Sequence, residues 1–80
     1  MSTSAWLLLV VERNRVRHTI ASADEALDML FKNWPVTNGG AFFMAMEACA
    51  GTVEGIVTEG EAQSAFLAAA FDARVVVRIA

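Results

Sequence analysis

A stretch in the middle of the chain, residues 34–55, constrains the fold most, because it joins a helix stop to the most apolar helix. Pro35 disfavours helical geometry at the residue before it, so a helix that reaches Trp34 ends there. After a turn with two glycines, residues 40–53 carry a single charge, Glu47. A polar stripe this narrow predicts a helix that is buried nearly all round and lies in the middle of the fold.

Apolar runs near both ends of the chain predict strands. Residues 5–12 are rich in Leu and Val and are too short for a typical helix. Side chains alternate along a strand, so both faces of this one are apolar. One face carries Trp6, Leu8 and Val10, and the other carries Leu7, Leu9 and Val11. A strand with two apolar faces belongs in the centre of a sheet.

Two further strands are predicted beside the first. Arg13 and Asn14 are expected to form a two-residue hairpin turn, because Asn tolerates positive φ. Residues 16–20 then return as the second strand, and residues 74–79 close the chain as the third. In the second strand, one face carries Val16, His18 and Ile20, and the other continues from Arg15 to Arg17 and Thr19. In the third, Val75, Val77 and Ile79 lie opposite Arg74, Val76 and Arg78.

Capping boxes mark the starts of the first and third helices. Ser22 precedes Glu25 by three residues, and Thr58 precedes Glu61 by the same spacing. The order is therefore β-β-α-α-α-β. This order predicts an α+β fold with two layers, in which three helices cover one face of a three-stranded sheet. The 80 residues are expected to form one domain, in which residues 1–4 fray.

The composition leaves few ways to stabilise so short a chain. The single Cys49 excludes an internal disulfide, and with the single His18 it excludes a zinc site built on repeated Cys and His spacing. The chain is 56% hydrophobic and 19% charged, against roughly 45–50% and 25% in typical domains. This surplus of apolar side chains predicts self-association.

No membrane-spanning segment is predicted. The longest uncharged apolar runs, residues 5–11 and 65–71, hold seven residues each, whereas a spanning helix needs about 18. The first residues lack the basic region of a signal peptide, and Glu12 and Arg13 stand where its small-residue cleavage site would be. We therefore expect a cytoplasmic protein.

A set of landmarks runs through nearly the whole chain, roughly residues 6–79. The landmarks are residues 23–30, Trp34, Pro35, Gly39, Gly40, Ala41, Phe42, Ala45, Cys49, Gly55, Glu61, Ala62, Ala65, Phe66, Ala69, Ala70 and Ala73. This pattern resembles domain-of-unknown-function family 982, small uncharacterised proteins of rhizobia and related bacteria. The family often has an arginine where this chain has Gln63. The resemblance implies a bacterial cytoplasmic setting and no activity, because the family has none established.

No catalytic, cofactor-binding or metal-binding residue is predicted, and an enzyme is the weakest hypothesis. Cys49 lies within the apolar helix, where no neighbour lowers its pKa, so we interpret it as a buried structural residue. His18 could be a proton shuttle or a pH switch, but no second histidine and no adjacent carboxylate supports this. Glu47 and Glu54 lie roughly 10 Å apart along one helix face, as expected for a solvated stripe.

The charges are divided unevenly along the chain. Residues 1–20 and 73–80, which include the strands, hold five arginines and one glutamate. Residues 21–72, the helical part, hold one lysine and eight acidic residues. Two solvated faces would explain this division, and so would a basic surface that binds a partner.

Two functions are consistent with this pattern. The first is a homodimeric structural or interaction module, in which the uncovered apolar face of the first strand packs on a second copy, with arginines at the rim. The alternative is binding of nucleic acid or another polyanion, with Trp6 stacking on bases. Against it stand the net charge of −3 and the lack of an aromatic ribonucleoprotein motif. The predicted interaction residues are Trp6, Leu8, Arg15, Arg17, Arg74, Val76 and Arg78.

Overall fold

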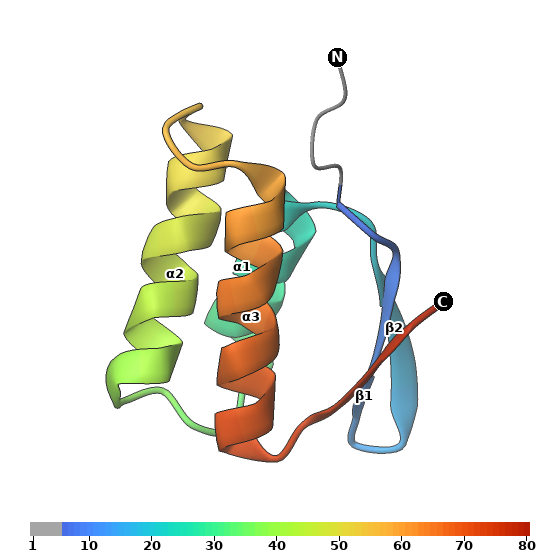
Figure 1. The fold of residues 1–80 in the computed structure, drawn as a ribbon. Helices are drawn as coiled ribbons and strands as arrows, with labels where there is room; N and C mark the ends of the chain where they lie inside the picture. The colour runs from blue at the N-terminus through green and yellow to red at the C-terminus, as the bar shows by residue number, and fades with distance from the viewer. Residues whose placement is uncertain (1–5) are drawn as a thin grey trace.

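The structure, a computed structural model, describes residues 6–80 and confirms the predicted α+β class and element order. The elements are β1 (Leu9–Arg13), β2 (Val16–Ile20), α1 (Ala23–Lys32), α2 (Gly40–Val53), α3 (Glu59–Ala73) and β3 (Val76–Ile79) (Figure 1). β1 lies in the centre of a three-stranded antiparallel sheet of order β2-β1-β3. The fraying predicted for residues 1–4 falls outside the described residues.

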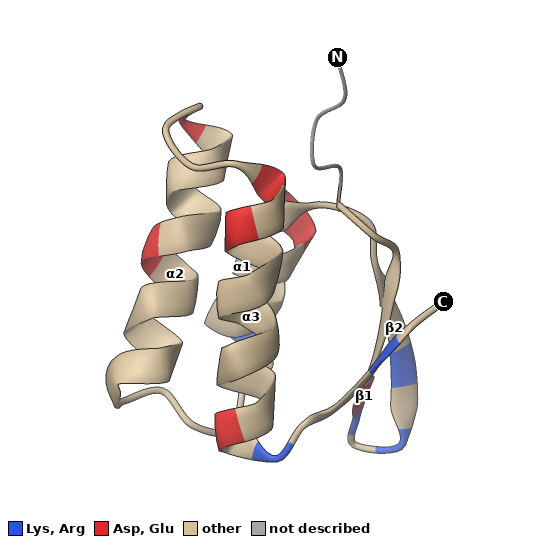
Figure 2. Cartoon of the chain, in the orientation of Figure 1, with Lys and Arg blue, Asp and Glu red and all other residues tan. Residues whose placement is uncertain are grey.

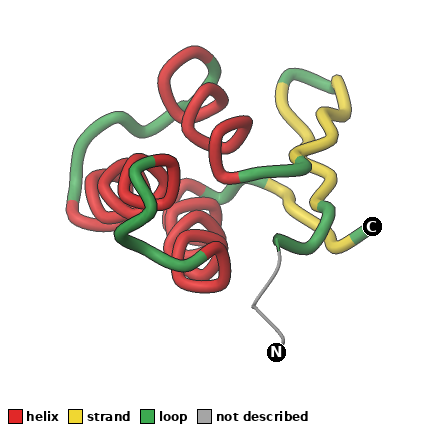
Figure 3. Tube along the Cα trace, turned by 90° about the horizontal axis from the view of Figure 1, so that it is seen from above, coloured by secondary structure: helices red, strands yellow, loops and turns green. Residues whose placement is uncertain are grey.

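The three helices lie on one side of the sheet, but only α1 and α3 contact the strands (Figure 3). α2 packs against α1 and α3 on the side away from the sheet. The prediction that α2 is buried nearly all round is therefore wrong. Its inner side, which includes Ala45 and Cys49, is fully buried, whereas Phe43 and Met44 are more than half exposed. An outermost helix touches neighbours on one side only, however apolar its sequence is.

Phe66 of α3 forms the centre of the core. Its side chain is fully buried, and its ring lies 6.2 Å from that of Trp6 and 5.3 Å from that of Trp34, measured between centroids. Leu9 and Val11 supply the inner face of β1, and both are fully buried. The core therefore extends from the inner face of the sheet, past α1 and α3, to the inner side of α2.

The helix starts follow the capping residues. The Ser22 hydroxyl accepts from the Glu25 N–H at 3.1 Å, and the Glu25 carboxylate accepts from the N–H of Ala21, one residue earlier than a capping box predicts. At α3, the reciprocal bonds between Thr58 and Glu61 are both present. Both caps satisfy backbone donors that have no partner within the helix.

The hairpin turn lies one residue later than predicted. Arg13 pairs with Val16, so the two-residue turn consists of Asn14 and Arg15, with φ of 52° and 67°. Two positive φ values are the signature of a type I′ turn, whose twist matches that of the strands. Arg15 consequently adopts a left-handed conformation that favours Gly.

We expect Arg15→Gly to raise the free energy of unfolding by about 0.5–1 kcal/mol. Glycine relieves the left-handed strain, and its greater freedom in the unfolded chain offsets part of the gain. Urea denaturation followed by circular dichroism measures the change. Asn14→Gly is the matched control and should gain less, because Asn already tolerates this conformation. Equal or lower stability of Arg15→Gly would contradict the strain argument.

Candidate interaction surface

The outer face of the sheet carries four of the seven predicted interaction residues. Val10 pairs with Thr19 and Arg78, and Glu12 pairs with Arg17 and Val76. Because side chains alternate along a strand, all six point to the face away from the buried Leu9 and Val11. By the same alternation Leu8 belongs to this face, and its side chain is 45% exposed. Leu8, Arg17, Val76 and Arg78 thus lie together on the face that no helix covers.

The other three predicted residues lie outside the three strands. Trp6 turns to the helix side, where its ring packs on Phe66 and its Nε1–H donates to the Ile20 carbonyl at 3.0 Å. Arg15 lies in the hairpin turn. Arg74 caps the C-terminus of α3 in a left-handed conformation, with φ of 59° and ψ of 37°, before β3 begins. Trp6 therefore does not share the outer face, and Arg15 and Arg74 lie in the segments that flank the strands.

The segment before β1 is tied to α3 by polar contacts. The Trp6 N–H donates to Glu59 Oε1 at 3.1 Å, and the Leu7 N–H donates to Gln63 Oε1 at 3.2 Å. Gln63 Nε2 donates in return to the Leu7 carbonyl at 2.7 Å. Gln63 is 7% exposed, so this reciprocal pair is nearly shielded from water. These bonds turn the chain away from the strand direction, and Trp6 follows into the core.

The charge division predicted from the sequence appears in three dimensions. Figure 2 shows the acidic residues mostly on the helices and the basic residues mostly on the hairpin and around β3. On the outer face, Arg17 Nε lies 3.5 Å from Glu12 Oε2. Arg78 makes no ion pair with any described residue. The outer face therefore has one neutralised arginine and one free arginine.

β3 has an open backbone edge, because no described strand pairs with its outer side. The Ala80 N–H donates to the Leu8 carbonyl at 2.9 Å, so the backbone N–H and C=O groups of Ala80 point toward β1. Backbone groups alternate in direction along an antiparallel strand, so Val77 and Ile79 direct their N–H and C=O groups outwards. The sequence could not reveal this edge, because strand order was needed to find it.

α3 is the helix that contacts β3. Figure 3 shows α3 and β3 on one side of the molecule and α1 and β2 on the other. The Gln63 side chain faces the segment before β1, and Phe71 lies eight residues later, in the last turns of α3. Phe71 is 87% exposed. The helix that contacts β3 therefore also carries an uncovered apolar side chain.

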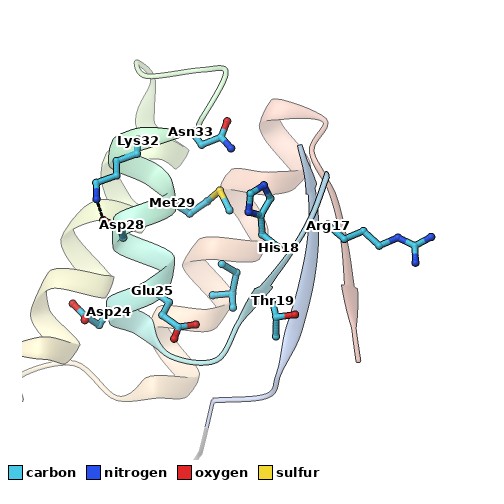
Figure 4. Close-up of a pocket in the computed structure, with 10 residues that line it drawn as sticks. Arg17, His18, Thr19, Asp24, Glu25, Asp28, Met29, Lys32 and Asn33 are labelled. Atoms are coloured by element: carbon cyan, nitrogen blue, oxygen red, sulfur yellow. Dashed lines mark ion pairs between the residues drawn. The ribbon is translucent and has the colours of Figure 1, made fainter. Parts of the chain in front are cut away.

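A polar groove of about 750 Å³ separates β2 from α1. Figure 4 shows His18 and Met29 pointing into it from opposite walls, whereas Arg17 points away to the other side of the sheet. Lys32 Nζ and Asp28 Oδ1, at 2.9 Å, form an exposed ion pair on α1. Across the described chain, His, Cys, Asp and Glu side chains form no group of three or more that could hold a metal ion. The groove therefore presents side chains of both charges.

A shallower apolar groove of about 560 Å³ follows the outer side of α2. Met44, Gly51 and Val57 contribute to its floor, and Glu47 and Glu54 also line it. The two glutamates lie at this groove as helical spacing predicts, and both are exposed.

Cys49 lies in the core, as predicted, with a fully buried side chain. Burial raises the pKa of its thiol from 9.0 to about 11, because desolvation penalises the thiolate. A thiol this poorly ionised at neutral pH is a weak nucleophile.

We expect the fold to lose stability between about pH 9 and 11 through Cys49. The folded pKa is the higher one, so the folded state holds the proton more tightly than the unfolded state. The stability that the protonated Cys49 thiol contributes is complete below pH 9, and it is lost as pH rises through the folded pKa. Urea midpoints at pH 7, 9 and 11 measure it. Cys49→Ala should lack this alkaline decline, and an identical decline in the variant would assign it to other groups.

None of the described helices combines the length and apolarity needed to cross a membrane. A search of curated proteins and a search of solved structures found no significant match. A family model does match, over residues 7–77, and it is described as a protein of unknown function, DUF982. The match spans every helix and the hairpin, and it ends within β3. This chain therefore belongs to the DUF982 family, whose description assigns no function.

Proposed function

We propose that this protein is a self-associating interaction module whose partner is a second copy of the same chain. The observation that carries the proposal is the number of uncovered apolar side chains. Eleven large hydrophobic residues are exposed among those described, in a chain of 80 residues. A domain this small, without a disulfide in its described part, commonly gains stability from oligomerisation.

The exposed side chains of the sheet are the strongest support for a second copy as the partner. Val76 is 53% exposed and Ile79 is 61% exposed, and both lie on the strand at the sheet edge. Leu8 and Val10 continue the apolar surface across the outer face, with Arg17 and Arg78 beside them. Arginine suits an interface, because its stem packs while its guanidinium pairs with carboxylates.

The nucleic-acid alternative has less support. It needs an aromatic ring on the arginine-bearing face to stack on bases. The ring of Trp6, the predicted stacking residue, packs on Phe66, and its indole N–H is bonded to Ile20. Arg17 already lies beside Glu12. A cytoplasmic location for the module remains a prediction.

Size-exclusion chromatography with light scattering tests the proposal, over micromolar to hundred-micromolar protein and at low and high salt. The expected result is a mass of twice the chain, retained at high salt because apolar contacts and backbone hydrogen bonds carry the association. A monomer at every concentration would overturn the proposal. Salt-dependent binding of a single-stranded oligonucleotide by that monomer would then favour the alternative.

A further inference from the structure

The open edge of β3 is self-complementary. We propose that two copies of the chain pair antiparallel through β3, about a two-fold axis at Val77, so that the two three-stranded sheets become one continuous sheet. This inference rests on the proposed self-association and specifies its surface and register. It differs from packing of two outer faces, because the helices of both copies then lie on the same side of the joined sheet.

The free backbone groups of β3 fit this arrangement. Val77 and Ile79 direct their N–H and C=O groups outwards, as the bond from Ala80 to Leu8 requires. With Val77 opposite its copy, the two valines exchange a reciprocal pair of hydrogen bonds. The Ile79 N–H then meets the carbonyl of Val75 in the second copy. The Val75 N–H is not needed there, since it donates to the Ala70 carbonyl at 2.8 Å within its own chain.

Charge selects this register over its nearest alternative. A two-fold axis at Arg78 would still pair residues whose backbone groups face the open edge. It would, however, place Arg78 directly opposite Arg78 of the second copy. Residues at such a non-hydrogen-bonded position have Cα atoms only about 4.5 Å apart, and like charges directly opposite destabilise a sheet. With the axis at Val77, Val76 lies opposite Arg78 of the second copy instead.

The same register gives Arg78 an acidic partner. Glu12 pairs with Val76, so Arg78 of the second copy lies two strands from Glu12, about 9.5 Å away. Two long side chains can span that distance over the shorter Val76. Glu12 would then lie between Arg17 of its own chain, at 3.5 Å, and Arg78 of the second copy. Arg78 has no ion-pair partner among the described residues of its own chain.

Exposed apolar groups become buried on the helix side of the joined sheet. Ile79, which shares the inner face with Leu9, would pack against Val75 of the second copy. The two α3 helices would face each other across the axis, because α3 is the helix beside β3 (Figure 1). Phe71, which is 87% exposed on α3, is a candidate for burial between these helices.

Val77→Pro tests the surface without breaking the monomer. The Val77 N–H faces the open edge, so proline removes a donor that β1 does not use. We expect the dimer dissociation constant to rise at least about 30-fold, as for the loss of a reciprocal pair of hydrogen bonds. Light scattering measures the mass, and far-ultraviolet circular dichroism confirms that the fold is retained.

Thr19→Pro is the matched control on the opposite edge. The bond from Ala80 shows that Leu8 and Val10 direct their backbone groups toward β3, so Leu9 and Val11 direct theirs toward β2. Their partners Ile20 and His18 therefore face β1, and the N–H of Thr19 faces away from the sheet. This variant should remain dimeric. A wild-type monomer would overturn the proposed function itself. A folded Val77→Pro variant that dimerises like the wild type would overturn the β3 surface while self-association stands.

Disulfide trapping tests the register independently of proline. Val77→Cys places two thiols at a hydrogen-bonded pair with Cα atoms about 5.5 Å apart, within the range that disulfides span. Under mild oxidation this variant should give a covalent dimer, and Arg78→Cys should not. The native Cys49 is buried and does not interfere. Cross-linking of Arg78→Cys in place of Val77→Cys would overturn the register.

Discussion

Replacement of Phe66 by alanine is expected to remove a large share of the free energy of unfolding. Phe66 is fully buried between Trp6 and Trp34, and large-to-small changes of this kind cost about 3–5 kcal/mol. A domain of this size has a total free energy of unfolding of roughly 4–12 kcal/mol. Thermal and urea denaturation, followed by circular dichroism, measure the loss.

The matched control is Phe31→Ala on α1. Phe31 is 69% exposed, so the same change in side-chain size should alter the free energy of unfolding by no more than about 0.5 kcal/mol. If the two variants lost equal stability, the packing of the three aromatic rings would not be the centre of the core.

The second large effect is expected at Gln63, where Gln63→Glu should destabilise the fold by about 2–4 kcal/mol at pH 7. The amide both accepts from the Leu7 N–H and donates to the Leu7 carbonyl, and a carboxylate can only accept. The introduced carboxylate would leave the Leu7 carbonyl facing a buried negative charge. The measurement is the urea midpoint relative to wild type at each pH.

Acid should rescue this variant. The neutral carboxyl can donate to the Leu7 carbonyl as the amide does, so folding raises the pKa of the introduced group. A raised folded pKa means that stability is present below the unfolded value, roughly 4.3, and lost as pH rises. The difference from wild type should therefore shrink near pH 4. Gln63→Leu removes both bonds and should be destabilised at both pH values. If Gln63→Glu lost the same stability at every pH, the assigned donor and acceptor roles of Gln63 would be contradicted.

Local patterns in the sequence predicted the elements well. Capping residues located the starts of α1 and α3, and the doubly apolar run at β1 predicted a central strand. These features depend on residues close together in the chain. The hairpin turn shifted by one residue because Asn14 can occupy either position of a two-residue turn.

Features that depend on distant residues could not be predicted. Trp6 leaves the strand alternation because its segment bonds to Glu59 and Gln63, more than fifty positions away. No local pattern in the sequence indicates a contact across so large a separation. Similarly, α2 is apolar all round, and its periodicity cannot show which side faces its neighbours.

The close packing after α2 is a further case. A Cβ added at Gly51 would lie 2.6 Å from Val57 Cγ2, so the loop packs where no side chain fits. The open β3 edge likewise required the strand order and one hydrogen bond, from Ala80 to Leu8.

Amide hydrogen exchange at β3 tests self-association through this edge most directly. Within one chain, the N–H groups of Val77 and Ile79 face outwards, as do those of Arg17 and Thr19 on the opposite edge. We predict that Val77 and Ile79 exchange slowly at high protein concentration and faster on dilution, while Arg17 and Thr19 exchange fast throughout. Exchange at Val77 and Ile79 as fast as at Arg17 and Thr19, at every concentration, would contradict the account.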